Sequence, residues 1–198
     1  MAVTTVSCVI KNKLSIFLSV VVIYPTASYR GVLKNKLKIT SSRLDDLQND
    51  ITYMQQALNE ATHAERADEI PVGAILVLDE KIIATAYNQT VMHCDPTAHA
   101  EILVLQRAAK QLKNHRLVET VLYVTLEPCL MCVGAMIQAR IKRLVFGAYD
   151  ARLGAITHQL HHFKGLNHTF EVTEGVLSEV CAKQLKEFFK YKRHCSLA

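Results

Sequence analysis

An α/β fold, with helices packed over a mixed β-sheet, is predicted by two features of the amino-acid sequence. From residue 50 onward, short strands rich in β-branched residues alternate with segments whose apolar residues recur at helical spacing. The first two strands, 72–78 and 82–87, are joined by a turn at Asp79-Glu80, which predicts an antiparallel hairpin. Strands that alternate with helices after such a hairpin are typical of α/β domains.

Capping signals set the expected starts of the helices. Asp50 is expected to cap a first helix, because Met54 and Ala57 follow it at helical spacing. Asp95 is expected to cap a second helix, with Pro96 at its first position. The expected elements from there on are helices at 98–110, 129–139 and 178–194 and strands at 120–125, 143–147 and 170–172.

Length and composition indicate one soluble globular domain. The chain has 198 residues, of which 50% are apolar and 21% charged. Two of its six cysteines form a Cys-x-x-Cys pair and the others are scattered. This usage favours a metal site in a reduced compartment over a disulfide scaffold, so we expect a cytoplasmic protein.

The first fifty residues differ in composition from the rest. Residues 11–28 have a basic start, an apolar run at 14–24 and small residues afterwards, an order that resembles a signal peptide. The apolar run is too short to span a membrane, which takes about twenty residues. We predict that residues 1–50 are a disordered or non-working extension and that residues 51–198 form the working domain.

One imidazole and two thiols in the central part of the chain have the spacing of a metal site. His99, Cys129 and Cys132 are a ligand set that suits zinc, and three protein ligands leave the fourth position open, as in catalytic sites. A structural zinc site is the alternative, and it needs a fourth ligand. His93 and Cys94 are the nearest candidates.

Glu101 is expected to be the acid and base beside this metal. His-x-Glu followed by Pro-Cys-x-x-Cys is the signature of the zinc nucleobase deaminases, in which the glutamate is not a ligand. On a regular helix His99 and Glu101 point about 200° apart. We therefore expect Glu101 to face the water and the substrate beside the metal rather than the metal itself.

Three stretches of the sequence resemble one family closely. They are DEIPVGAILV at 68–77, DPTAHAE at 95–101 and TVLYVTLEPCLMCVGAMIQARIKRLVFGAYD at 120–150. They are similar to the bacterial tRNA-specific adenosine deaminases, and the resemblance continues through EVTEGVL into the last helix. It covers about residues 51–198 and none of residues 1–50.

The resemblance implies a three-layer α/β/α cytidine-deaminase-like domain with a five-stranded mixed sheet, working as a homodimer. It implies hydrolysis of the wobble adenosine of a tRNA anticodon to inosine, with release of ammonia. By family similarity His99, Cys129 and Cys132 hold one zinc ion per subunit, and Glu101 moves the protons. Asn88 matches an asparagine at the rim of the base pocket, although a turn residue that ends a strand explains it as well.

Basic residues near the C-terminus are expected to contact tRNA phosphates. Lys190, Lys192 and Arg193 lie in a sixteen-residue tail with a net charge of +4. A solvated helix end, whose cations favour the helix dipole, explains the same pattern. In relatives we expect Arg-Pro where this chain has Gln89-Thr90, so one positive charge and one rigid turn beside the pocket are replaced.

Two other functions remain open at this point. A free-base or nucleotide deaminase, acting for example on guanine or a cytosine nucleotide, shares the metal signature but needs no surface for a polyanion. A non-catalytic zinc module that binds RNA also fits the ligand set, and it predicts that Glu101 is dispensable. Flanking sequence and the basic last helix favour the tRNA deaminase.

Overall fold

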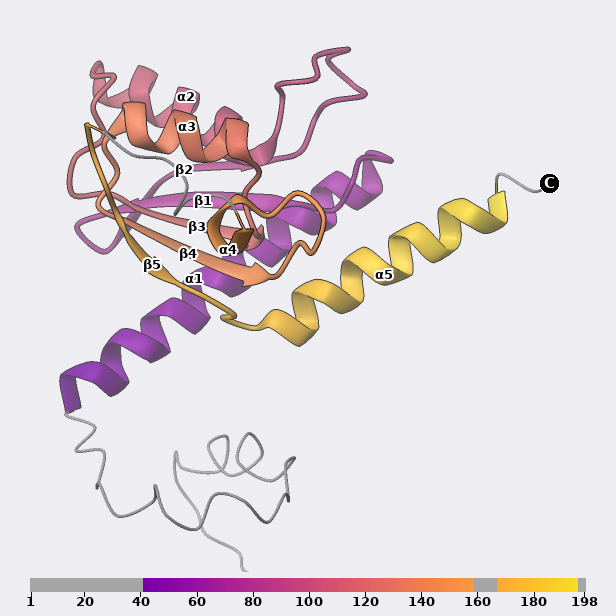
Figure 1. Ribbon diagram of the computed structural model, residues 1–198, viewed down its shortest axis with the longest axis horizontal. Coiled ribbons are helices and arrows are strands. Elements are labelled where there is room, and N and C mark those ends of the chain that lie inside the picture. Colours follow the sequence, from indigo (N-terminus) through magenta and orange to yellow (C-terminus); the bar gives the residue numbers. More distant parts are fainter. Residues whose placement is uncertain (1–40, 159–166, 196–198) are drawn as a thin grey trace, which may run out of the picture. The chain divides into compact units, whose positions relative to one another are not determined.

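A five-stranded mixed sheet lies between two layers of helices in the computed structural model, which describes residues 41–158 and 167–195 (Figure 1). The strand order is β2-β1-β3-β4-β5. The strands are β1 (Gly73–Leu78), β2 (Lys81–Tyr87), β3 (Val121–Leu126), β4 (Arg143–Ala148) and β5 (Glu171–Thr173). β1 is antiparallel to both β2 and β3, whereas β3, β4 and β5 are parallel to one another.

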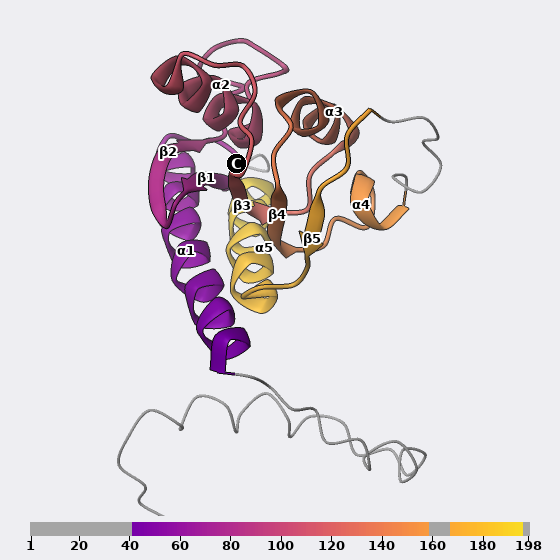
Figure 2. The same cartoon turned by 90° about the vertical axis from the view of Figure 1, so that its left-hand side faces the viewer.

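The five helices of the described residues cover both faces of this sheet (Figure 2). α2 and α3 lie side by side on one face, and α1 and α5 lie on the other. The short α4 contacts the outer side of α3. Their bounds are α1 (Ser41–Arg66), α2 (Ala100–Leu112), α3 (Leu130–Ala139), α4 (Ala155–His158) and α5 (Ser178–Cys195).

Alternation along β3 shows why the domain has three layers. Leu122 and Val124 are fully buried against α2 and α3, while Tyr123 between them packs under α1 and α5. Successive side chains of a strand point to opposite faces, so a strand that is apolar at every position must be covered on both sides. The predicted α/β/α sandwich with five strands is thereby confirmed.

Gly73 at the start of β1 allows α1 to approach the sheet closely. A Cβ atom at this position would lie 2.1 Å from the backbone oxygen of Ala57, which no side chain tolerates. The close approach places the end of α1, and with it Glu69 in the following turn, beside the ends of β1 and β2.

The expectation that Asp50 caps the first helix is wrong. α1 begins at Ser41, so Asp50 lies inside the helix, where its side chain is only 3% exposed. Its carboxylate accepts a hydrogen bond from the Tyr123 hydroxyl at 2.8 Å and two from the Arg143 guanidinium at 3.1 and 2.6 Å. Asp50 thus joins α1 to β3 and β4 instead of ending a helix.

The predicted boundary at residue 50 falls within α1, and the compact domain begins at Ser41. The idea that residues 1–50 have no role in the working protein stays a prediction. The signal-like segment at 11–28 lies outside the described residues. In the part of the chain that is described, no helix is both long and apolar enough to cross a membrane.

Replacing Asp50 should destabilise the domain strongly. Asp50→Ala leaves the half-buried Arg143 guanidinium without its anion, and breaking such a pair costs about 3 kcal/mol or more of unfolding free energy. Urea unfolding followed by circular dichroism measures this loss. Asp46→Ala, on an exposed position one turn earlier in α1, should change stability by less than about 0.5 kcal/mol. Equal effects of the two substitutions would contradict the role of the Asp50–Arg143 pair.

Candidate metal centre and adjoining cavity

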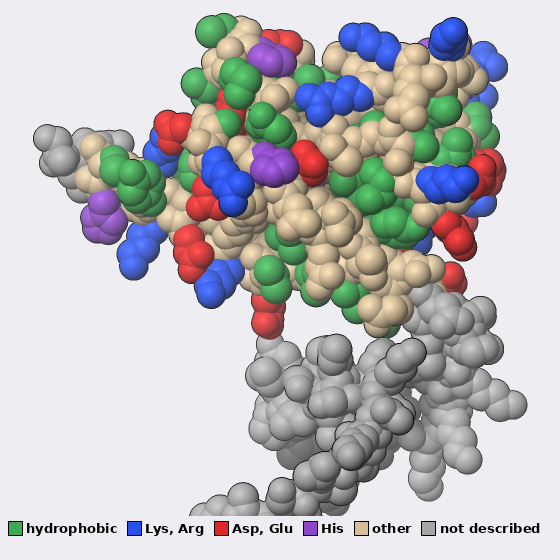
Figure 3. Space-filling model, turned by 180° about the vertical axis from the view of Figure 1, so that it is seen from behind, with side chains coloured by type: hydrophobic (Ala, Val, Ile, Leu, Met, Phe, Trp, Pro, Cys, Tyr) green, Lys and Arg blue, Asp and Glu red, His purple; other side chains and the backbone are tan. Residues whose placement is uncertain are grey.

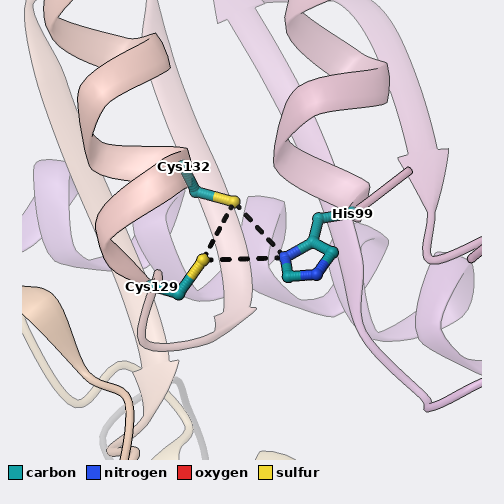
Figure 4. A group of neighbouring side chains, drawn as sticks. All are labelled: His99, Cys129 and Cys132. Atoms are coloured by element: carbon teal, nitrogen blue, oxygen red, sulfur yellow. Dashed lines mark hydrogen bonds between the residues drawn. The ribbon is translucent and has the colours of Figure 1, made fainter. Parts of the chain in front are cut away.

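Three side chains with metal-binding atoms meet between the N-terminal ends of α2 and α3 (Figure 4). His99 is the N-cap of α2, Cys129 is the N-cap of α3, and Cys132 lies in the first turn of α3. Both caps have extended backbones and neither side chain caps its own helix. The imidazole and the thiols are therefore free to point toward one another.

The distances among the three atoms match a tetrahedral metal site. Nδ1 of His99 lies 3.5 Å from Sγ of Cys132 and 3.7 Å from Sγ of Cys129, and the two sulfurs are 3.7 Å apart. Zinc bonds of about 2.3 Å to sulfur and 2.0 Å to nitrogen, at tetrahedral angles, give edges of about 3.5 to 3.8 Å. The three side chains therefore fit a metal ion without rearrangement.

The electrostatics of this group also favour metal binding. Contact with the Cys132 thiol, and then with His99, lowers the pKa of Cys129 to about 4, so its thiolate forms readily. The hydrogen bond with Cys129 and burial raise the pKa of Cys132, which favours the protonated thiol there. A metal ion that displaces this proton gains two thiolate ligands.

Glu101 lies beside the metal-binding group and lines the same cavity as His99. Its side chain is 4% exposed, and burial raises the pKa of its carboxyl group above the usual range. The expected divergence of His99 and Glu101 around a helix does not apply, because His99 precedes the helix. From the extended N-cap position the imidazole points toward Cys129 and Cys132 (Figure 4).

Asp95 does not cap this helix, contrary to expectation. α2 begins at Ala100, and the Asp95 carboxylate instead accepts hydrogen bonds from the backbone and the hydroxyl of Thr97 at 2.8 and 2.7 Å. These bonds close a separate turn ahead of His99, which also brings Ala98 N–H to the Asp95 carbonyl. The turn leaves His99 extended at the start of the helix.

The metal-binding group opens into a cavity of about 700 Å³. Asn88 and Thr90 after β2 line it, as do Leu126 and Glu127 at the end of β3 and the loop 149–153. One side of α5 completes the wall through Leu185, Lys186, Phe189 and Arg193. The cavity therefore has room for a nucleobase with its sugar, and its floor carries the metal-binding group and a buried carboxylate.

Asn88 lies at the wall of this cavity and is only 6% exposed, while its role toward a substrate stays a prediction. Its Nδ2 donates to Oε2 of Glu69 at 3.1 Å and to the hydroxyl of Thr90 at 3.2 Å. Sequence reasoning missed Glu69, because a carboxylate in an exposed-looking turn gives no signal that it will be buried.

Glu127 anchors the loop on another side of the cavity. Its carboxylate accepts hydrogen bonds from the backbone of Asp150 at 3.1 Å and from the backbone and hydroxyl of Thr157, both at 2.8 Å. Each of its partners is a donor, so the side chain fixes the loop 149–157 and is not free to transfer protons.

The three basic residues singled out in α5 have different surroundings. Arg193 lines the cavity, Lys190 is exposed, and Lys192 forms an ion pair with Asp68 and lies 5.6 Å from the Phe188 ring centroid. On the face shown in Figure 3, Lys and Arg side chains of the described residues are interspersed with Asp and Glu. The cationic side chains at the cavity itself are Arg193 together with Lys186 and Arg152, which the sequence did not single out.

No fourth protein ligand belongs to the metal-binding group among the residues that the structure describes. The group consists of His99, Cys129 and Cys132 alone, and Cys94 is exposed and free. A structural four-ligand site through His93 or Cys94 therefore lacks support. The open side of the group faces the cavity, as a reaction site requires.

Comparison with known proteins identifies the family. Residues 48–193 match the MafB19-like deaminase family. The tRNA-specific adenosine deaminase of Haemophilus influenzae is 51% identical over 147 residues, which span 73% of this chain and 85% of that protein. This chain belongs to the tRNA-specific adenosine deaminase family. The resemblance read from the sequence is thereby confirmed.

Two solved structures show how far the family likeness extends. One, from work on A-to-I editing by tRNA:A34 deaminases at the wobble position of transfer RNA, is 41% identical with a TM-score of 0.65 and covers 67% of this chain and 98% of its own. A guanine deaminase from Nitrosomonas europaea is 26% identical with a TM-score of 0.61 and covers 70% of this chain and 83% of its own. The family thus shares its fold with a deaminase of a free purine base.

A glycine substitution tests whether Glu127 holds the cavity loop. A Cβ atom at Gly154 would lie 2.3 Å from Oε2 of Glu127 and 2.5 Å from the backbone oxygen of Asp150, so Gly154→Ala should disturb the contact between the carboxylate and the loop and destabilise the domain by about 1–3 kcal/mol. Gly134, on the exposed side of α3, has nothing within 4 Å of such an atom. Gly134→Ala should therefore be neutral or stabilising by about 0.5–1 kcal/mol. Denaturant unfolding of both variants checks the opposite signs, and destabilisation by Gly134→Ala alone would refute this account.

Proposed function

We propose that this protein hydrolyses adenosine to inosine at the wobble position of a tRNA anticodon, with release of ammonia, and that it requires zinc. The observation that carries the proposal is the meeting of His99, Cys129 and Cys132 with buried Glu101 at the floor of one cavity. The chain's place in the tRNA-specific adenosine deaminase family supplies the substrate.

His99, Cys129 and Cys132 would hold one zinc ion per subunit, since their donor atoms already have the separations of a tetrahedral site. When bound, zinc lowers the pKa of a water molecule from about 15.7 to about 7, which makes a hydroxide nucleophile available at neutral pH. The chain's own contribution is to hold the ligands in place, to exclude bulk water and to direct the substrate.

Glu101 is the residue that moves protons in this proposal. It takes a proton from the nucleophilic water, and it delivers protons to the ring nitrogen next to the attacked carbon and to the departing amino group. Its burial and its position on the first turn of α2 support this role, because both keep the carboxyl group directed at the cavity floor.

The walls of the cavity support an RNA substrate. An anticodon loop is single-stranded, so its bases can leave the stack and enter a pocket. Arg193 at the cavity and exposed Lys190 nearby on α5 are placed to contact phosphates that flank the flipped base. Lys192 contributes through its pair with Asp68, which ties α5 to the turn after α1. Asn88 contacts the base or its sugar at the rim.

The assembly and the location of the protein follow from the family resemblance. We propose a homodimer that works in the cytoplasm, without a membrane or a second kind of protein partner. Both statements stay predictions of the sequence.

A substrate panel tests the proposed reaction. Zinc-loaded protein should form inosine in an anticodon stem-loop with adenosine at the wobble position, and should leave free adenosine, cytidine and guanine unchanged. Glu101→Gln should lower the rate by about 10³-fold or more, because it removes the proton transfer group. Chromatography of nuclease digests measures inosine. Deamination of free guanine in place of the stem-loop would assign the chain to base salvage, and full activity of Glu101→Gln would overturn the mechanism.

Metal content provides a separate test. The protein should retain about one zinc per chain after dialysis, and Cys129→Ala should lose it, because only two ligands remain. Cys94→Ala removes an exposed thiol outside the metal-binding group and should keep the metal. Mass spectrometry of the metal measures both variants. Zinc that survives in Cys129→Ala would show that the ion is held elsewhere.

A further inference from the structure

Another buried carboxylate, apart from Glu101 and Glu127, lies behind the wall of the cavity. Glu69 follows the end of α1 and is 1% exposed, although it is not among the residues that line the cavity. Its Oε2 accepts hydrogen bonds from Nδ2 of Asn88 at 3.1 Å and from the hydroxyl of Thr90 at 3.2 Å. Its Oε1 accepts the backbone N–H of Met92 at 2.7 Å. Among the described residues, every hydrogen-bond partner of the Glu69 side chain belongs to the segment 88–92.

These contacts fix which end of the Asn88 amide faces the cavity. A carboxylate only accepts hydrogen bonds, so the amide must turn its NH₂ group toward Glu69. Nδ2 is then used twice, by Glu69 and by Thr90. Oδ1 of Asn88 has no hydrogen-bond partner among the described residues. Every fully buried polar side-chain atom of these residues does have a partner, so Oδ1 cannot be fully buried. Oδ1 is therefore open to the cavity.

We propose that Glu69 is a positioning residue for substrate recognition. It holds the Asn88 amide so that the cavity presents a hydrogen-bond acceptor, which selects a nucleoside that offers a hydroxyl or amino donor at that point. The same carboxylate holds Met92 and thereby the loop that follows Asn88. This inference rests on the proposed function, because it concerns the substrate of the same cavity.

Exchanging the carboxylate of Glu69 and the amide of Asn88 tests the orientation of the Asn88 side chain directly. In Glu69→Gln the new side chain has one oxygen and one NH₂ group. If its oxygen faces Asn88, its NH₂ group meets the Met92 N–H, donor against donor. If its oxygen faces Met92, the Asn88 amide must turn over and present a donor to the cavity. Combining Glu69→Gln with Asn88→Asp lets the glutamine accept from Met92 and donate to the aspartate, which still presents an oxygen to the cavity. The pair keeps its total charge and reverses its roles.

We expect Glu69→Gln to lower kcat/KM on the stem-loop by about tenfold to a hundredfold, through the lost interaction with the substrate donor. The combined variant should recover at least about tenfold of this loss. In protein that already carries Asn88→Ala, Glu69→Gln should lower kcat/KM by less than about threefold, because the residue through which Glu69 acts is gone. Glu119→Gln, a matched change on an exposed carboxylate paired with Lys142, should have no effect.

A purely structural role of Glu69 gives different results. It predicts equal losses from Glu69→Gln with and without Asn88, a loss that follows the unfolding midpoint, and no recovery in the combined variant. Any of these three results would overturn the proposal. Binding of the stem-loop to Glu101→Gln protein, measured by fluorescence anisotropy, should weaken with Glu69→Gln if Glu69 acts on recognition.

Proton exchange in the free protein keeps the test independent of the reaction. The side-chain amide protons of Asn88, assigned by their loss in Asn88→Ala, should exchange slowly in the wild-type protein and rapidly in Glu69→Gln. If the wild-type protein forms no inosine, the proposed function fails, and these protons still decide the orientation of the amide. Rapid exchange in the wild-type protein would show that Glu69 does not hold Asn88.

Discussion

The convergence of three ligand atoms between two helix N-termini is the constraint on which the rest of the structure depends. His99 and Cys129 are both N-cap residues with extended backbones, so each side chain projects forward from its helix into the space between α2 and α3. This works only if the two helices lie side by side on one face of the sheet. The antiparallel β1–β3 pair and the parallel β3–β4 pair set that spacing, because α2 follows the β1–β2 hairpin and α3 follows β3. The sheet thereby places the histidine ligand at the start of α2 and the two cysteine ligands at the start of α3 next to each other.

Buried carboxylates give the cavity its shape once the metal-binding group is in place. The Glu69 carboxylate accepts hydrogen bonds from the segment after β2. The Glu127 carboxylate accepts them from Asp150 in the loop after β4 and from Thr157 in α4. Loops carry backbone N–H groups that no ladder satisfies, and a buried acceptor with several such partners fixes a loop in one conformation. Each of these two walls of the cavity is therefore held by a buried carboxylate that lies just after the end of α1 or of β3. Asn88 gains its fixed orientation in this way.

The sequence predicted those features that neighbouring residues determine, namely the strands and the metal-binding motifs. The strands were predicted within about two residues because apolar runs such as that of β1 must be buried on both faces, and the His-x-Glu and Cys-x-x-Cys motifs carry their geometry with them. The capping prediction was wrong at Asp50 because its carboxylate finds stronger partners elsewhere in the fold. It was wrong at Asp95 because that carboxylate closes a local turn with Thr97 ahead of the helix. Asp50 pairs with Arg143, which is 93 residues away along the chain. Glu69, Lys186 and Phe189 gave no local signal, since the cavity forms only when α1 and α5 pack on the sheet.

Substrate choice in this fold must arise outside the metal-binding group. The likeness to a guanine deaminase shows that one fold serves more than one purine substrate, so the fold alone does not select adenosine in RNA over a free base. Hydrogen-bonding groups at the rim discriminate most strongly, because a buried polar group that loses its partner costs more than a lost apolar contact. The Asn88 amide is such a group, and its direction is set by Glu69 and Thr90 behind it. The side of α5 that closes the cavity adds Arg193, whose charge suits a phosphate of the proposed RNA substrate. In the proposed function, recognition of a nucleotide within RNA combines both features, an acceptor that Glu69 orients at the rim and a cation on α5 for the RNA backbone.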